Sequence, residues 1–271
     1  RSLVDLSNKF PLLLTAHDCW LMTGHCAHPL DCKNFQTGCG NCPDISIPPA
    51  IKRDATRSNL LRKKSVFTSS RIYLATPCNW LKQMFLDSQV GSFFKEIRII
   101  PNGVDTSTFR PLRGKTLLRQ KHGVDKDALV FIFVGNKTSS NPWKNFQLMF
   151  EALKIAARSI DKKIFFLSVG EKKKTIAEDN FVTHFIGHTN DLSKLNELYN
   201  CSDFYLHLSK ADTFPNTVLE AQACGVPILT NPICGIKEQV IESHTGWFLD
   251  IYSKEQVASK ILDILKLTKN K

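Results

Sequence analysis

Residues 129–135 read LVFIFVG, residues 164–170 read IFFLSVG, and residues 145–158 between them have apolar side chains at helical spacing. Neither apolar run contains a charged residue, so each predicts a strand that is buried on both faces of a sheet. The apolar side chains on one face of the intervening helix are Phe146, Met149, Phe150, Leu153 and Ala157. A buried strand, a covering helix and a second buried strand predict a parallel β–α–β unit.

The same alternation continues toward the C-terminus. Further strands are expected at 182–187, 203–208, 226–230 and 246–249. Further helices are expected at 191–200, 216–224, 236–242 and 254–266. Continuous apolar strands separated by helices predict an α/β fold with a doubly wound parallel sheet, in which ligands bind beyond the carboxyl ends of the strands.

The first half predicts a smaller and less regular α/β domain. Strands are expected at 12–16, 71–76 and 97–100, with a helix at 79–86 and an irregular, cysteine-rich loop at 23–49. The stretch 101–125 contains Pro101, Gly103, Pro111 and Gly114 and is expected to be an interdomain linker. We therefore expect a Rossmann-like N-terminal domain over 1–110 and a Rossmann-like C-terminal domain over 111–271.

Net charge favours anionic partners. The 271-residue chain has a net charge of +11, which suits nucleic acid, acidic lipid or phosphorylated ligands. The longest basic stretch, Lys52–Arg71, fits either a solvated helix face or a docking face for anionic lipid head groups. The part from Lys52 to Lys64 has no interleaved aromatic residues, which argues against nucleic acid.

Cysteine usage points to a reducing compartment. The nine cysteines are an odd number, and no secretion signal or apolar run of about 18 residues accompanies them. Four cysteines gather in the loop 23–49 beside His25 and His28. These four are Cys26, Cys32, Cys39 and Cys42. The cluster fits a structural zinc site, free thiols packed in a loop, or a redox or disulfide pair.

The strongest chemical signal is DTFPNTVLE at residues 212–220. Asp212 follows a predicted strand, and Pro215 suits the first turn of a helix. Backbone amides at the start of that helix would offer a site for a diphosphate, and Glu220, a turn further on, would accept hydrogen bonds from sugar hydroxyls. The alternative is helix capping by Asp212 or Asn216, with Glu220 in solvent.

This segment resembles the E-x7-E region of family 4 glycosyltransferases, which have the GT-B fold of two Rossmann-like domains. With AQACGVP at 221–227 it is similar to the pattern D-x-F-P-N-T-x-L-E-A-x-A-C-G-x-P of a bacterial exopolysaccharide and colanic-acid-type subgroup. The resemblance implies that Glu220 binds the nucleotide ribose and that Asp212, in place of the usual glutamate, approaches the donor sugar. It implies that a donor-holding loop is formed by Phe214, Pro215, Asn216 and Thr217.

Three more motifs extend the resemblance. Residues 101–111 are similar to N-G-I/V-D-x-x-x-F-x-P, and residues 234–238 resemble G-G-I/V-x-E with Cys234 replacing the first glycine. Lys144 corresponds to the lysine that contacts the donor diphosphate, although this chain has Trp-Lys-Asn where the family has R-K-G. Lys137 corresponds to a second phosphate-binding residue.

The first half also resembles the subgroup. Residues 17–42 are similar to H-D-x-W-x-x-T-G-x-C…C…T-G-C-G-x-C-P, and the family's catalytic-site histidine corresponds to His17, which follows a predicted buried strand. The family's first domain begins with a strand and a glycine-rich loop that are not found before Arg1. The chain is therefore expected to be a fragment whose first domain is incomplete.

The resemblance implies a retaining glycosyltransferase. It would move a hexose-type sugar from a nucleoside diphosphate sugar to a glycan or lipid-linked acceptor hydroxyl in surface polysaccharide synthesis, with no cofactor required for catalysis. The enzyme would be cytoplasmic, with peripheral contact at the inner face of the plasma membrane. The alternatives are an inactive, truncated remnant that still binds nucleotide sugar, and a nucleic-acid-binding protein. A GT-B epimerase or phosphorylase would need other acids or a lysine-bound cofactor, and no motif for either is found.

Overall fold

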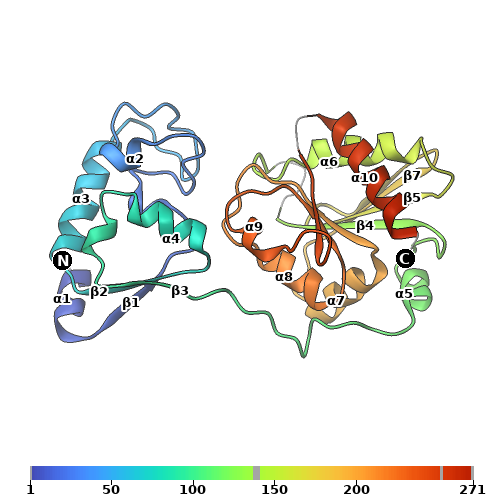
Figure 1. Ribbon diagram of the computed structural model, residues 1–271, viewed down its shortest axis with the longest axis horizontal. Coiled ribbons are helices and arrows are strands. Elements are labelled where there is room, and N and C mark those ends of the chain that lie inside the picture. Colours follow the sequence, from blue (N-terminus) through green and yellow to red (C-terminus); the bar gives the residue numbers. More distant parts are fainter. Residues whose placement is uncertain (1, 137–140, 251–252, 270–271) are drawn as a thin grey trace. The chain divides into compact units, whose positions relative to one another are not determined.

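The chain forms two compact units, each with its own sheet. The computed structural model describes residues 2–136, 141–250 and 253–269 (Figure 1). The first unit is Arg1–Asn102 and the second is Gly103–Lys271.

The second unit contains a seven-stranded sheet with strand order β10-β9-β8-β4-β5-β7-β6. Its strands are β4 (Leu129–Val134), β5 (Ile164–Val169), β6 (Lys174–Glu178), β7 (Phe181–Ile186), β8 (Phe204–His207), β9 (Ile228–Thr230) and β10 (Gly246–Phe248). All neighbours pair in parallel except β6 and β7. The predicted parallel sheet is confirmed. Strand β6 was not predicted, because at the sheet edge its side chains are mostly exposed and form no apolar run.

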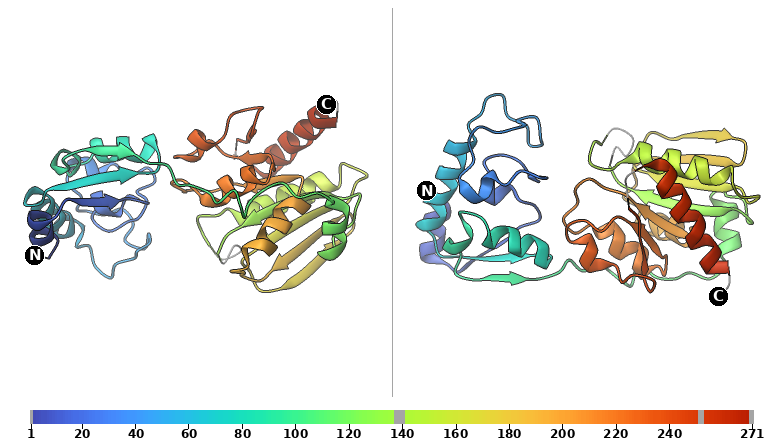
Figure 2. Two further views of the ribbon diagram at one scale, coloured as in Figure 1. Left: turned by 90° about the horizontal axis from the view of Figure 1, so that it is seen from below. Right: turned by 45° about the horizontal axis from the view of Figure 1, so that its top comes forward.

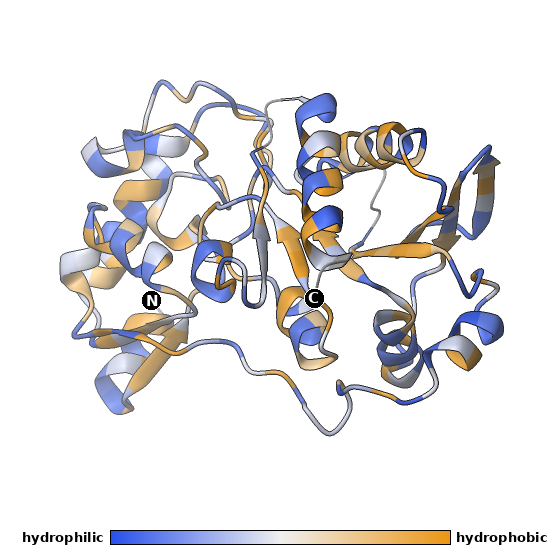
Figure 3. Cartoon of the chain, turned by 45° about the vertical axis from the view of Figure 1, so that its right-hand side comes forward, coloured by the Kyte–Doolittle hydropathy of each residue, from blue (hydrophilic) through white to orange (hydrophobic). Residues whose placement is uncertain are grey.

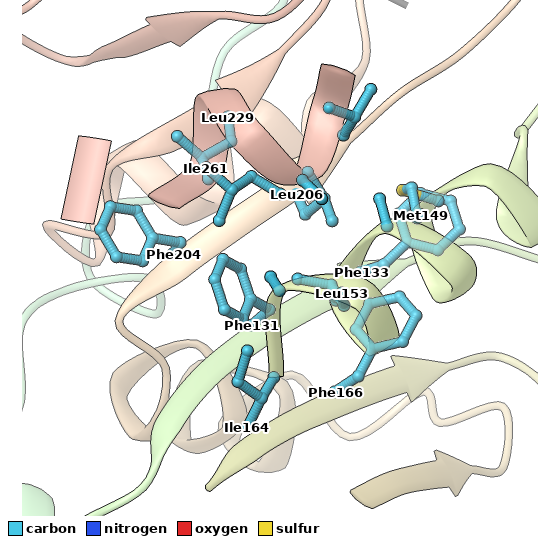
Figure 4. Packing of buried hydrophobic residues seen from close by; sticks show 14 of the residues in the cluster. Phe131, Phe133, Met149, Leu153, Ile164, Phe166, Phe204, Leu206, Leu229 and Ile261 are labelled. Carbon is cyan, nitrogen blue, oxygen red and sulfur yellow. The ribbon is translucent and has the colours of Figure 1, made fainter. Parts of the chain in front are cut away.

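Helices cover both faces of this sheet (Figure 2). They are α5 (Lys115–Lys121), α6 (Phe146–Ala157), α7 (Leu192–Cys201), α8 (Asn216–Ala223), α9 (Ile236–Gln239) and α10 (Lys254–Lys269). Successive strand residues face opposite sides. Phe131 and Phe133 therefore pack in the cluster beneath α6 and α10 (Figure 4), whereas Val130 and Ile132 pack in the cluster with α7 and α8. The central strands are accordingly hydrophobic along their length (Figure 3).

The neighbouring strands β4 and β8 flank a topological switch point of the sheet. From β4 the chain moves to β5 on one side, and it later returns to β8 on the other side of β4. At such a point the loops after the two central strands diverge and leave a crevice for ligands at the carboxyl edge. Lys144 lies in the segment after β4, and Asp212 lies in the loop after β8.

The first unit contains a three-stranded parallel sheet, β1-β2-β3. Its elements are α1 (Ser2–Lys9), β1 (Leu12–Thr15), η1 (Trp20–Met22), α2 (Asn34–Thr37), α3 (Thr56–Thr68), β2 (Ile72–Thr76), α4 (Asn79–Leu86), η2 (Gly91–Phe93) and β3 (Ile97–Ile99). The expectation that β1 is buried is wrong. This strand lies at the sheet edge, where exposed and half-buried side chains alternate and Leu13 is 59% exposed.

The segment expected to be a linker belongs mostly to the second unit. Phe109 packs edge-on against Tyr199, and Asn200 of α7 accepts a hydrogen bond from the Leu112 amide at 2.7 Å. Helix α5 follows, and its Arg119 is buried. The structure therefore divides after Asn102, earlier than the predicted division after residue 110. Proline and glycine spacing carries no information about these long-range contacts.

Among the residues described, no helix combines the length and the hydrophobicity that crossing a bilayer requires.

Candidate functional site

Lys144 and Asp212 meet at the carboxyl edge of the central strands. Lys144 Nζ donates a hydrogen bond to Asp212 Oδ2, although the two residues are 68 positions apart in the sequence. The side chains are only 19% and 17% exposed, so water screens their attraction less than at an open surface. The contact forms because β4 and β8 are neighbours in the sheet.

A second partner of Asp212 comes from inside the sheet. His207, the last residue of β8, is completely buried, and its Nε2 lies 3.1 Å from Asp212 Oδ2 and 2.9 Å from Ser209 Oγ. Its Nδ1 lies 3.0 Å from the hydroxyl of Tyr205, which is also fully buried. This histidine is not among the site residues predicted from the sequence. Its signal was a polar residue inside the apolar run FYLHL at 204–208.

The neighbours of Asp212 keep it ionised. Burial by itself would raise its pKa, but the bonds and charges of His207 and Lys144 outweigh burial and lower the pKa from 3.8 to about 2. Burial lowers the pKa of His207 below its ordinary 6.5, although its bond to Asp212 opposes that change. Asp212 is therefore a carboxylate and His207 a neutral imidazole at neutral pH.

The loop from Thr213 to Thr217 enters helix α8. Its N-cap residue, Pro215, provides no side-chain capping bond, and Asn216 is exposed at the first helical position. Neighbouring elements fix the loop, because Gln239 Nε2 donates to Pro215 O at 3.0 Å and the Tyr205 hydroxyl lies 2.7 Å from Thr217 Oγ1. The start of this helix can offer amide groups and a positive dipole to an anion.

Glu220 lies one turn into α8. The Tyr199 hydroxyl donates a hydrogen bond to Glu220 Oε2 at 2.8 Å. Burial raises the pKa of Glu220, and the Tyr199 bond partly opposes that rise. Its other carboxylate oxygen remains a site at which hydroxyl groups of a ligand can donate.

The remaining predicted residues have different placements. Phe214 is half-buried in the loop before α8. Lys137 lies outside the described residues. His17 is exposed shortly after β1, in the first unit, and Asp18 beside it accepts a hydrogen bond from the Trp20 amide at 2.8 Å. The assignment of His17 to the catalytic site stays a prediction.

The clustered cysteines line one small cavity in the first unit. Its volume is about 20 Å³, and all four predicted zinc ligands, Cys26, Cys32, Cys39 and Cys42, contribute to its wall. Buried His25 also lines it, with Nε2 3.4 Å from the Cys42 sulfur and Nδ1 3.1 Å from Pro49 O. Nowhere in the described ranges are three or more His, Cys, Asp or Glu side chains arranged to hold a metal ion. Zinc binding therefore stays a prediction.

The comparison that decides the family covers the second unit. The sequence model of the glycosyl transferases group 1 matches residues 114–271, which include Lys144, Asp212 and Glu220. The chain belongs to the glycosyl transferases group 1. Membership agrees with the predicted resemblance, whose strongest motif, at residues 212–227, lies within the matched residues.

Two curated relatives match most of the chain. The putative colanic acid biosynthesis glycosyl transferase WcaC of Escherichia coli K12 is 27% identical over 264 residues, 95% of this chain and 59% of WcaC. The lipopolysaccharide glucosyltransferase WaaG of the same strain is 26% identical over 192 residues, 64% of this chain and 50% of WaaG. The chain thus spans about half to three fifths of the length of these two relatives.

Solved structures confirm the GT-B fold. Anabaena HepE, crystallised with UDP and glucose, superposes with a TM-score of 0.66 at 17% identity, over 96% of this chain and 63% of HepE. The WaaG structure superposes with a TM-score of 0.57 at 18% identity, over 78% of this chain and 58% of WaaG. At this identity the likeness concerns the fold of the group 1 chain alone.

Proposed function

We propose that this chain carries the donor site of a retaining glycosyltransferase. The enzyme transfers a hexose-type sugar from a nucleoside diphosphate sugar to a hydroxyl of a glycan or lipid-linked acceptor in surface polysaccharide synthesis. The observation that carries the proposal is the set of Lys144, Asp212 and Glu220 around the start of α8, at the switch point between β4 and β8. WcaC and WaaG, named for colanic acid and lipopolysaccharide, support the acceptor class.

Each residue meets one chemical demand of the reaction. The leaving diphosphate accumulates negative charge, which Lys144 and the amides at the start of α8 stabilise without a catalytic metal. The Glu220 carboxylate accepts hydrogen bonds from the ribose hydroxyls. Asp212, ionised and largely shielded from water, orients the donor sugar and stabilises the positive charge that develops on its ring.

Calorimetric titration tests the donor site. We expect the full chain to bind one of UDP, GDP or ADP and its sugar conjugate, with UDP the first choice because HepE was crystallised with it. Lys144→Ala and Glu220→Gln should each weaken binding about 10- to 100-fold, the range for lost hydrogen bonds to charged groups. Lys154→Ala in helix α6, which removes a lysine paired with Glu178, is the matched control and should bind normally.

The outcomes separate the candidate functions. Unchanged affinity in both variants would contradict the assignment of the site. Normal binding without transfer to lipid-linked or glycan acceptors would favour the alternative of an inactive remnant. If transfer occurs, activity that EDTA leaves intact would support catalysis without a metal.

We also propose peripheral contact with anionic lipid at the cytoplasmic face through Lys52–Arg71. In this stretch Arg57 and Arg62 are exposed beside Leu61, which is 54% exposed, so basic groups surround an apolar anchor. Lys63 and Lys64 instead donate hydrogen bonds within the chain, to Thr23 O and Gln89 Oε1 respectively. Flotation with phosphatidylserine vesicles should be reduced in Arg57→Glu/Arg62→Glu and unchanged in Arg158→Glu. Equal flotation of both variants would contradict the contact.

A further inference from the structure

His207 connects Asp212 to the loop that begins α8. One ring nitrogen, Nε2, faces Asp212 Oδ2 at 3.1 Å, and the other, Nδ1, faces the Tyr205 hydroxyl at 3.0 Å. That hydroxyl in turn lies 2.7 Å from Thr217 Oγ1 in the first turn of α8. The ring therefore lies in the middle of a continuous polar path from Asp212 to the start of the helix.

Burying a histidine at this place costs free energy of folding unless both ring nitrogens have hydrogen-bond partners. The residue is completely buried at the end of a central strand, with the Phe133 ring edge-on to it, so an aliphatic side chain would fill the space without desolvating a polar ring. The polar groups that face the imidazole are Asp212 and Ser209 at Nε2 and Tyr205 at Nδ1, and Lys144 lies beyond Asp212. With the proton on Nε2, the neutral ring donates to Asp212, and its Nδ1 faces the Tyr205 hydroxyl.

Lys144 cannot hold Asp212 throughout the proposed reaction. Asp212 Oδ2 contacts both Lys144 Nζ and His207 Nε2 in the structure. A donor diphosphate carries more negative charge than one carboxylate and would draw the Lys144 ammonium toward itself. Once that happens, His207 is the partner that keeps Asp212 oriented, because it comes from the rigid end of β8 and not from a long flexible side chain.

We propose that His207 is the positioning residue of the donor site. It holds the Asp212 carboxylate toward the donor sugar while Lys144 binds the diphosphate. Through Tyr205 it also fixes the position of Asp212 relative to the start of α8. This inference rests on the donor site described under the proposed function.

Two amide variants separate the roles of the ring nitrogens. The His207→Gln amide reaches the position of Nε2 and can still donate to Asp212, whereas the shorter His207→Asn reaches only the position of Nδ1. The measurement is the sugar increment, the dissociation constant of the nucleoside diphosphate divided by that of its sugar conjugate. We expect His207→Gln to keep the wild-type increment and His207→Asn to reduce it about 10-fold, the value of a hydrogen bond to a charged group. Both variants should keep wild-type affinity for the nucleoside diphosphate alone.

A merely structural histidine would change thermal stability and both affinities together, so equal increments in the two variants, or an absent wild-type increment, would overturn the inference. If either variant fails to fold, the ¹⁵N shifts of His207 in wild-type protein decide: a proton on Nε2 supports the inference, and an Nε2 without a proton overturns it. Failure of wild-type protein to bind any sugar nucleotide would overturn the proposed function itself, an outcome distinct from normal binding with unchanged increments.

Discussion

Glu220 is the residue whose ionisation should control donor binding. Burial raises its pKa above the ordinary 4.5, and only the carboxylate accepts bonds from both ribose hydroxyls. Binding should therefore be complete above the raised pKa and weaken as the pH falls through it, with a midpoint above 4.5. Asp212, whose pKa is about 2, does not titrate in this range.

Tyr199→Phe provides the matched test of that pH dependence. The variant removes the hydrogen bond that partly lowers the Glu220 pKa, so the midpoint of nucleotide affinity should move to higher pH. Glu220→Gln should bind weakly with no such midpoint. A wild-type midpoint at or below 4.5, or one that Tyr199→Phe leaves in place, would contradict the assignment.

The backbone explains one departure from the family pattern. Asn145, which stands at the glycine of the R-K-G pattern that the resemblance gives, is the N-cap of α6 with φ +43°, a left-handed conformation that glycine and asparagine adopt most readily. Asn145→Gly should therefore bind nucleotide within about 2-fold of wild type. Asn145→Val costs about 1–2 kcal/mol in that conformation and should displace the adjacent Lys144, weakening affinity about 10-fold. Calorimetry on both variants measures this, and equal affinities would show that the turn does not position Lys144.

The buried Arg119 joins helix α5 to neighbouring segments of the second unit. Arg119 donates to Asp203 Oδ2 at 2.8 Å and to the carbonyl oxygens of Cys201, Lys126 and Ala128. Arg119→Met would leave these acceptors without their donor and should lower the free energy of unfolding by about 3 kcal/mol. Lys121→Met removes the exposed partner of Glu197 and should cost under about 1 kcal/mol. Urea denaturation compares the two, and equal losses would contradict this account of α5.

The cysteine-rich loop carries the zinc prediction. If zinc is bound, elemental analysis of protein purified without chelators should find about one ion per chain, and Cys39→Ser/Cys42→Ser should lose it while Cys201→Ser in the second unit keeps it. Metal-free wild-type protein with unchanged stability would leave packed thiols or a redox pair as the alternatives.

At the scale of the whole molecule, the two units have separate cores. Both hydrophobic clusters of the second unit draw only on residues after Asn102, and its site residues lie there too. The fragment 103–271 should therefore unfold cooperatively and bind nucleotide like the full chain. The fragment 111–271, cut at the boundary predicted from sequence, lacks buried Phe109 and should be less stable. Equal urea midpoints for the two fragments would contradict the placement of the boundary.

The sequence by itself determined the parallel sheet and the acidic pair. Apolar runs and helical spacing are local patterns, and the DTFPNTVLE segment keeps Asp212 and Glu220 on one loop and helix start. Only the tertiary structure decided that Lys144 and His207 converge on Asp212, that β1 is an exposed edge, and that the units divide after Asn102. These features depend on which strands become neighbours and on side-chain contacts that the folded chain creates, and no local period encodes either.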